Sequence, residues 1–165
     1  GSLLVKAPRG CPKTEIDRFV LSKRDWIEKQ RRNMETLRAR KQAAVPFTDG
    51  DFSRMGKALA ERLPALLRDV SRRLCVTYGK VTVRPMRSRW GSCSSNGNLS
   101  FNSLLAEAPP SVQEYVVVHE LCHRLEMNHS SRFWDRVRTL CPDYADSVRW
   151  LKTEGKALLI RIPED

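Results

Sequence analysis

The segment Val116-Val117-Val118-His119-Glu120-Leu121-Cys122-His123 contains two of the three histidines of the chain. It follows Pro109-Pro110, a pair that suits the start of a helix. Its apolar residues continue the helical spacing of Val112 and Tyr115. We therefore predict a mostly buried helix that ends in the pattern His-Glu-x-x-His.

This pattern is typical of a metal site on a helix. Residues four apart lie about 40° apart around a helix and roughly 6 Å apart along it, so both imidazoles can bind one ion at about 2.0–2.1 Å. His129 follows in a segment where the chain can fold back. Three histidine ligands leave the fourth tetrahedral position open, as in catalytic zinc sites. We predict one Zn²⁺ per chain bound by His119, His123 and His129, with Glu120 as the general base toward a zinc-activated water.

Each of these residues also has a simpler interpretation. His119 and His123 could be packed helix histidines beside a solvated Glu120, and His129 could be a solvent-facing loop residue. We expect Cys122 to pack beneath the site rather than to bind the ion as a thiolate. Because no histidine remains to stabilise an oxyanion, Tyr144 or Arg89 is predicted for that role, with core packing as the alternative for Tyr144.

Helical periodicity dominates both ends of the chain. Apolar residues at helical spacing predict one helix over residues 14–41 and a second over 52–74, which Pro64 should kink or split. A shorter helix is expected from Ser130 or Ser131, and a last one after Cys141-Pro142.

Between these helices lie three strand patterns. They cover residues 80–84, 87–93 and 99–102, and Asn96-Gly97 predicts a hairpin between the last two. The fold class is therefore α+β, with N-terminal helices, a small antiparallel three-stranded sheet, the His-Glu-x-x-His helix and C-terminal helices. We expect a substrate strand to pair with an exposed sheet edge at Leu99–Asn102.

A set of residues around these elements resembles the YgjP-like metallopeptidase family, which is similar to the wider SprT-like zincins. The set is Arg89-Trp90-Gly91-Ser92-Cys93-Ser94, Gly97, Asn102, Pro109, Val118 to His123, Asn128-His129-Ser130 and Phe133-Trp134. The resemblance implies a single compact zincin domain over residues 3–165, with the helix of His119, Glu120 and His123 beneath a short twisted sheet and His129 as third ligand.

Family members often carry a β-rich segment before this point. Gly1-Ser2 has the character of a scar left by removal of a tag, so the natural N-terminus is expected to be missing.

Two related groups fit less well. Metzincins share the histidine spacing but place Gly where this chain has Glu126, and they use a Met-turn after the third ligand, whereas the last methionine here is Met127. SprT-like crosslink proteases generally carry their third histidine further along, so repair of DNA–protein crosslinks does not transfer.

Composition fits a globular protein of about one domain's length, with 165 residues of which 41% are hydrophobic and 30% charged. No apolar run approaches the roughly 18 residues that span a bilayer, and no leader opens the chain, so no membrane partner is expected. Five widely spaced cysteines without a C-x-x-C pair are typical of a reducing compartment. We predict a cytoplasmic protein.

The positive charge lies mainly in the first half of the chain. Residues 1–75 carry 18 Lys and Arg against nine Asp and Glu, a net charge of +9, whereas the remainder carries +2. A basic half could bind nucleic acid, or it could be a solvated helix face.

The predicted function is zinc-dependent hydrolysis of peptide bonds in a peptide or protein substrate. One alternative is a metal-dependent nucleotide or phosphate-ester hydrolase. The other is a nucleic-acid-associated protease or binding module that uses the basic N-terminal half.

Overall fold

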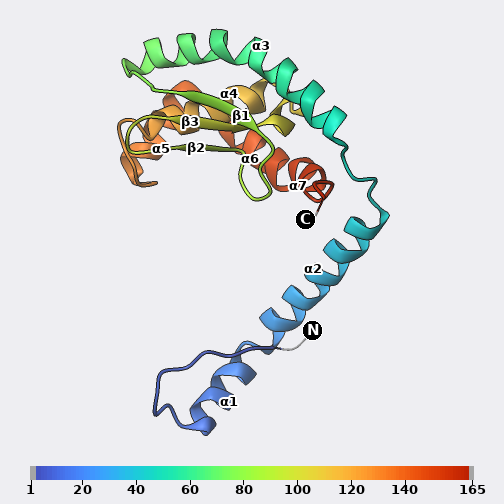
Figure 1. The fold of residues 1–165 in the computed structure, drawn as a ribbon. Coiled ribbons are helices and arrows are strands. Elements are labelled where there is room, and N and C mark those ends of the chain that lie inside the picture. Colours follow the sequence, from blue (N-terminus) through green and yellow to red (C-terminus); the bar gives the residue numbers. More distant parts are fainter. Residues whose placement is uncertain (1–2, 164–165) are drawn as a thin grey trace. The chain divides into compact units, whose positions relative to one another are not determined.

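The computed structural model of the protein describes residues 3–163 (Figure 1). Contacts within the chain divide it into two compact units, Gly1–Ala43 and Ala44–Asp165. The units are described separately below as unit 1 and unit 2. Gly1 and Ser2, the expected tag scar, lie outside the described residues.

Unit 1 contains helices α1 (Lys13–Ser22) and α2 (Arg24–Ala43). The prediction of one helix over 14–41 is therefore wrong, because the helical pattern breaks at Lys23, which has φ −106° and ψ 10°. The Ser22 hydroxyl donates a hydrogen bond to the Phe19 carbonyl at 2.7 Å, and such a side-chain partner competes with the helical ladder. Neither helix buries a residue in its described part.

Unit 2 begins with helix α3 (Asp49–Leu74). A capping box joins Thr48 and Asp51 at its start, and the buried face repeats every three or four residues: Met55, Leu59, Leu63, Leu67 and Val70. The helix continues across Pro64, so the expected split does not occur. Pro64 is exposed, and the buried leucines on either side of it hold both halves against the same core.

The sheet of unit 2 has the strand order β1 (Val81–Arg84), β3 (Leu99–Asn102), β2 (Gly91–Cys93). A hairpin joins β2 and β3 as predicted, and Gly97 in its turn has a φ of +80°. The sheet is mixed rather than all antiparallel, because β1 pairs with β3 in parallel. The chain crosses over after β1 to reach the other side of β3, which a sequence pattern of single strands does not reveal.

Strand β3 is the middle strand, so the expectation that it offers a free edge to a substrate is wrong. Leu99 and Phe101 are completely buried, and both neighbours of β3 are already hydrogen-bonded. The edges of the sheet are β1 and β2.

The crossover is organised by Asn102, whose side chain is fully buried. Its amide nitrogen donates to the carbonyls of Met86 at 2.6 Å and Arg89 at 2.9 Å, and its oxygen accepts from the Leu104 amide at 3.2 Å. These bonds hold residues 85–90 as a loop. Strand β2 is therefore shorter than the strand predicted over 87–93.

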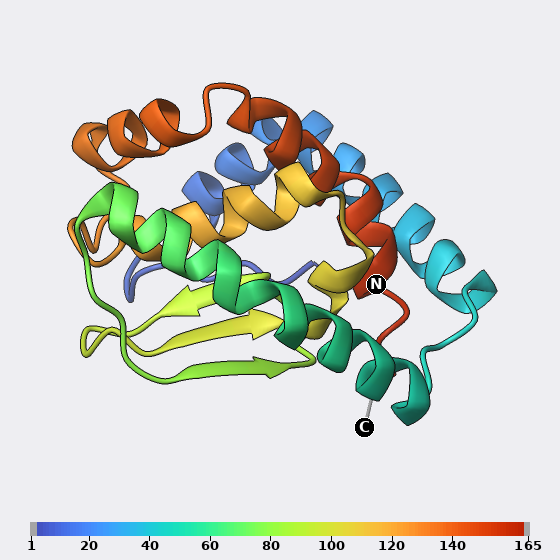
Figure 2. The same ribbon diagram turned by 90° about the horizontal axis from the view of Figure 1, so that it is seen from above.

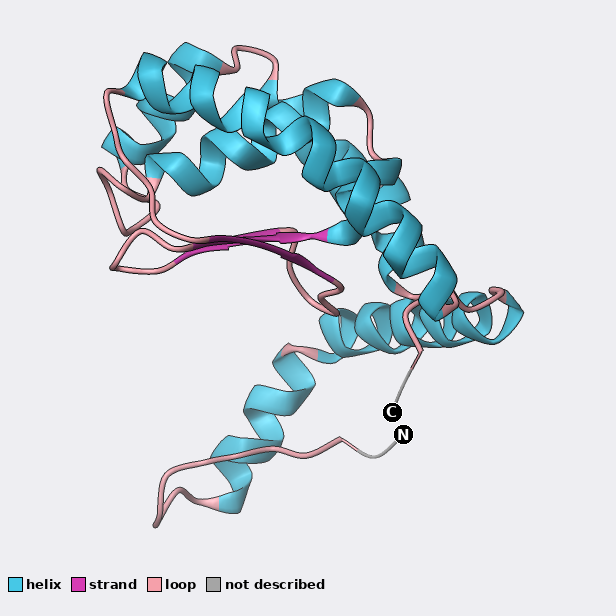
Figure 3. Ribbon diagram, turned by 45° about the horizontal axis from the view of Figure 1, so that its top comes forward, coloured by secondary structure: helices cyan, strands magenta, loops and turns pink. Residues whose placement is uncertain are grey.

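The elements after the sheet are a 3₁₀ turn η1 (Ser103–Glu107) and helices α4 (Pro110–Cys122), α5 (Ser131–Leu140), α6 (Tyr144–Lys152) and α7 (Glu154–Leu159). Helices α3 and α4 cover the same face of the sheet (Figures 2 and 3). The predicted α+β class is confirmed.

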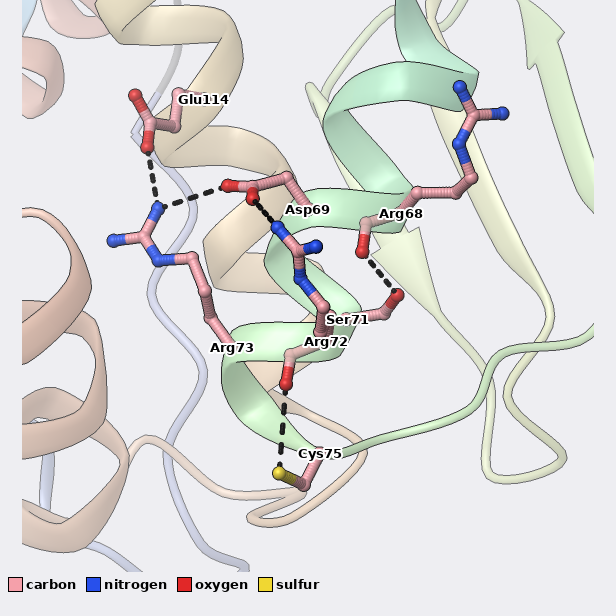
Figure 4. Close-up of polar contacts among 7 residues, drawn as sticks. All are labelled: Arg68, Asp69, Ser71, Arg72, Arg73, Cys75 and Glu114. Atoms are coloured by element: carbon pink, nitrogen blue, oxygen red, sulfur yellow. Dashed lines mark hydrogen bonds and ion pairs between the residues drawn. The ribbon is translucent and has the colours of Figure 1, made fainter.

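Arg73 links helix α3 to α4 and α5, and Figure 4 shows its contacts with Glu114 and Asp69. From the last turn of α3 it contacts Glu114 of α4 at 3.2 Å and Asp69 of its own helix at 3.5 Å, and it donates to the Leu140 carbonyl at the end of α5 at 3.2 Å. This side chain therefore connects the end of α3 to the first half of α4 and to the end of α5.

Residues near the end of unit 2 contact residues near its start. The Phe47 amide donates to the Arg161 carbonyl at 2.9 Å, and the Arg161 guanidinium donates to the Val45 carbonyl at 2.9 Å. The same guanidinium lies 3.9 Å from the centre of the Phe47 ring, in cation–π geometry. In the described residues, no helix is both long and apolar enough to cross a bilayer.

Replacement of Asn102 by Ala should destabilise the protein by roughly 2–4 kcal/mol, because it leaves two carbonyls and an amide without a partner. Urea unfolding of the metal-free protein measures this cost. Asn96→Ala, at an exposed position of the hairpin, is the control and should change stability by less than about 0.5 kcal/mol. Equal stability of the two variants would contradict the assigned role of Asn102.

Candidate metal centre

Helix α4 carries the first part of the site into the interior. Pro110 is its first residue, and Val112, Val116, Val117, Val118 and Leu121 are among its buried side chains. Because these lie all round the helix, it passes through the core rather than over it. His119 lies in its last turn and His123 is its C-cap.

The chain then turns back within a few residues. The amides of Arg124 and Leu125 bond to the carbonyls of Leu121 and Cys122 and end the helix. Helix α5 begins after Ser130, whose hydroxyl accepts from the Phe133 amide at 3.3 Å. His129 lies in this short connection, so the chain reversal brings it beside α4.

The structure brings the three histidines together. One ligand atom from each of His119, His123 and His129 lies within 4.8 Å of the other two. The Nε2 atoms of His119 and His129 are 3.0 Å apart. Zinc–nitrogen bonds of about 2.05 Å at tetrahedral angles put ligand nitrogens roughly 3.3 Å apart, so this donor set fits a zinc ion.

Phe133 forms the floor of this cluster. It is fully buried, and its ring centre lies 4.9 Å from that of His119 and 4.7 Å from those of His123 and His129. An apolar floor prevents the imidazoles from turning away into the core.

Hydrogen bonds orient two of the three imidazoles. His119 Nδ1 lies 3.4 Å from the Tyr115 hydroxyl, and His123 Nδ1 lies 3.1 Å from the Glu126 carbonyl. The Glu126 carbonyl can only accept, so Nδ1 of His123 carries the proton and its Nε2 keeps a free lone pair. Such outer contacts orient histidine ligands in metal sites.

Electrostatics favour neutral imidazoles. The pKa of His119 is lowered to about 4, mainly by burial and in addition by the charges of the neighbouring His123 and His129. Burial also lowers the pKa of His123. At neutral pH both rings can accept a metal without first releasing a proton.

Glu120 is 6% exposed and lies against strand β2. A Cβ at Gly91 would come within 2.6–2.9 Å of the Glu120 side chain, so only glycine leaves room for this carboxyl group. Burial raises the pKa of Glu120 to about 7, against the opposing effect of the Arg89 charge. A carboxyl group with this pKa can take up and release a proton near neutral pH.

The structure also shows the surroundings of Tyr144, Cys122 and Arg89. Tyr144, the first residue of α6, is partly buried and stacks on Trp134 and Tyr115, with ring centres 5.5 and 6.1 Å away. Cys122 is completely buried and burial raises its pKa to about 12, which disfavours a thiolate and agrees with the expected packing role. Arg89 is exposed and close enough for its charge to act on Glu120.

The sequence did not reveal the roles of Tyr115 and Gly91. In the sequence Tyr115 only continues the helical spacing of the buried residues, yet in the structure it is 5% exposed and its hydroxyl contacts His119. Its position one helical turn before His119 was the available signal. Gly91 could be recognised as a close approach, but its partner Glu120 is distant in sequence.

The match to a family profile agrees with a metal site of this kind. The family profile described as "YgjP-like, metallopeptidase domain" matches residues 1–57 and 52–154. The chain therefore belongs to the YgjP-like metallopeptidase family, as the resemblance implied, and the family assigns it to the hydrolases. A comparison with curated proteins gave no match.

Two solved structures are similar over about half of the chain. One is the metallopeptidase zymogen of Pyrococcus abyssi abylysin, with 22% identity, a TM-score of 0.49 and coverage of 55% of this chain and 94% of that one. The other is the zymogen of Methanocaldococcus jannaschii jannalysin, with 20% identity, a TM-score of 0.47 and coverage of 56% and 94%.

In the metal-free protein, Glu120→Gln should raise stability at pH 8 by roughly 1–3 kcal/mol. The ionised carboxylate is disfavoured in the folded state, so its cost is present above the folded-state pKa of about 7. This cost disappears as the pH falls to the ordinary value of 4.5, where the folded state is already protonated. Chemical unfolding after chelation, at both pH values, measures the difference. Glu61→Gln at an exposed position of α3 is the control, and a gain from Glu120→Gln that did not depend on pH would contradict this assignment.

Proposed function

We propose that the chain is a zinc-dependent metallopeptidase in which His119, His123 and His129 bind one Zn²⁺ and Glu120 is the general base. The observation that carries this proposal is the convergence of three imidazoles beside a buried carboxyl group whose pKa lies near 7. Membership of a metallopeptidase family supports a peptide or protein substrate.

The bound ion and Glu120 would have different roles in the reaction. Bound zinc supplies Lewis acidity that lowers the pKa of a water molecule toward 7 and polarises a carbonyl group. Glu120 accepts the proton of the attacking water and passes it to the amide nitrogen that leaves. Its confinement against Gly91 keeps the carboxyl group in place for both transfers.

Strand β2 is the sheet edge suited to a substrate, because its Gly91 lies against Glu120 and because, among the described strands, it pairs only with β3. A peptide would add to this edge through main-chain hydrogen bonds. Tyr144 or Arg89 would donate to the developing oxyanion. The proximity of Arg89 to Glu120 supports Arg89 for this role. Tyr144 is supported by its stacking on Trp134, whose ring lies against His119 and His129.

Two broader expectations accompany this function. We propose that residues 3–165 act as a single metallopeptidase domain, since the family profile extends across both compact units. A cytoplasmic location is supported by the five cysteines, all of which are free thiols. The comparisons offer no support for nucleic-acid binding or phosphate-ester hydrolysis, and both stay predictions from charge and composition.

Protein purified without added metal or a histidine tag should contain roughly one zinc per chain by elemental analysis. His129→Ala should lose most of this zinc, because it removes one of three ligands. Cys122→Ala should retain it, because Cys122 packs beneath the site. A zinc-free wild-type protein that also takes up no added zinc would refute the proposed metal site.

Glu120→Gln should retain zinc but lose hydrolysis of an unfolded protein substrate by at least about 100-fold, because the amide cannot accept the water proton. Cleavage followed by gel electrophoresis or mass spectrometry measures the effect. Wild-type cleavage by zinc-loaded Glu120→Gln would exclude Glu120 as the base. The exposed Glu61→Gln variant is the matched control and should cleave normally.

A further inference from the structure

The three proposed ligands differ in what orients them. His119 and His123 each have a polar partner at Nδ1, the Tyr115 hydroxyl and the Glu126 carbonyl. In the described residues no hydrogen bond reaches Nδ1 of His129, and its side chain is exposed. An exposed histidine in a short connection has free rotation to lose when it binds an ion.

His129 is instead held by an aromatic face. Its ring stacks on that of Trp134, with centres 5.8 Å apart and an angle of 26° between the planes. Trp134 projects from α5 and is partly buried, so its own ring is fixed by the core. Together with the edge contact of His129 on Phe133, this stacking restricts the His129 ring, which has no partner at Nδ1 in the described residues.

The stack continues beyond Trp134 and returns to the site. Trp134 stacks on Tyr144 at 5.5 Å and 27°, and Tyr144 stacks on Tyr115 at 6.1 Å and 22°. The hydroxyl of Tyr115 contacts Nδ1 of His119. One continuous path of side chains from α4, α5 and α6 therefore leads from one ligand to another without using the ion.

We propose that Tyr115, Tyr144 and Trp134 form an aromatic outer shell that holds His119 and His129 in the metal-binding orientation. Trp134 acts as the positioning residue of His129, and Tyr115 as that of His119. The inference rests on the proposed function, because it takes these histidines to be zinc ligands. It assigns the zinc affinity of the site in part to residues that do not touch the ion.

A role in core packing alone makes a different prediction. Loss of packing lowers the stability of the whole fold but leaves the zinc affinity of the folded protein unchanged. Loss of positioning raises the zinc dissociation constant of the folded protein, since the ligands must be ordered at the moment of binding. Loss of an outer-shell contact in metal sites typically costs about 10–100-fold in affinity.

The test uses the full chain and measures the zinc dissociation constant by competition with a chromophoric chelator. Trp134→Leu keeps an apolar side chain but removes the stacking face, and should raise the dissociation constant by about tenfold or more. Trp134→Phe restores an aromatic face and should remain within about threefold of wild type. Tyr115→Phe removes only the hydroxyl group and should weaken zinc binding by roughly tenfold.

Trp150→Leu provides the matched control. Trp150 is also partly buried and lies on α6, but it packs edge-to-face against Trp90, with ring centres 6.3 Å apart. Thermal unfolding of the metal-free variants reports their stability. Trp150→Leu should lower the unfolding temperature and leave the zinc dissociation constant unchanged.

The outcomes separate the two proposals. If wild-type protein binds no zinc, the proposed function fails. If wild type binds zinc and either folded Trp134→Leu or Tyr115→Phe binds it equally well, the proposed function stands and the aromatic outer shell is overturned. Tyr115→Phe alone decides the matter if Trp134→Leu does not fold, because it removes a single oxygen atom.

Discussion

The burial of helix α4 on nearly all of its faces is the constraint on which the rest of unit 2 depends. Its valines pack against α3, the sheet and the later helices, and this packing forces His119 and Glu120 into surroundings from which water is largely excluded. Burial is the first cause of both perturbed pKa values, downward for the imidazole and upward for the carboxyl group. The same apolar contacts that stabilise the fold therefore set the protonation states of the site.

The two sides of α4 meet different neighbours. Towards the sheet, Glu120 faces main chain at Gly91, where any side chain would displace it. Towards α5, His119 faces the rings of Phe133 and Trp134. Main chain at Gly91 therefore leaves room for one position of the Glu120 carboxyl group, and aromatic packing restricts the orientation of the His119 ring.

The sequence predicted the features that depend on residues close to each other in the chain. The periodicity of α4, the spacing of the three histidines and the hairpin at Gly97 depend on residues close to each other in sequence. The structure contains the helix and the hairpin, and it brings the three imidazoles together. The parallel pairing of β1, the central place of β3 and the crossover held by Asn102 depend on contacts between distant segments, which no local pattern encodes. The break at Lys23 was missed because the apolar pattern continues through it.

Two hydrogen bonds and a cation–π contact join Val45 and Phe47, near the start of unit 2, to Arg161 near its end. Because these contacts already hold Val45 and Phe47 beside Arg161, a covalent link between the two segments would cost little additional chain entropy. Such a unit can be reopened elsewhere: a circular permutant that links the two ends and starts within the exposed hairpin at Asn96 preserves every helix. The order of the elements along the gene is then separable from the arrangement that brings the three histidines together.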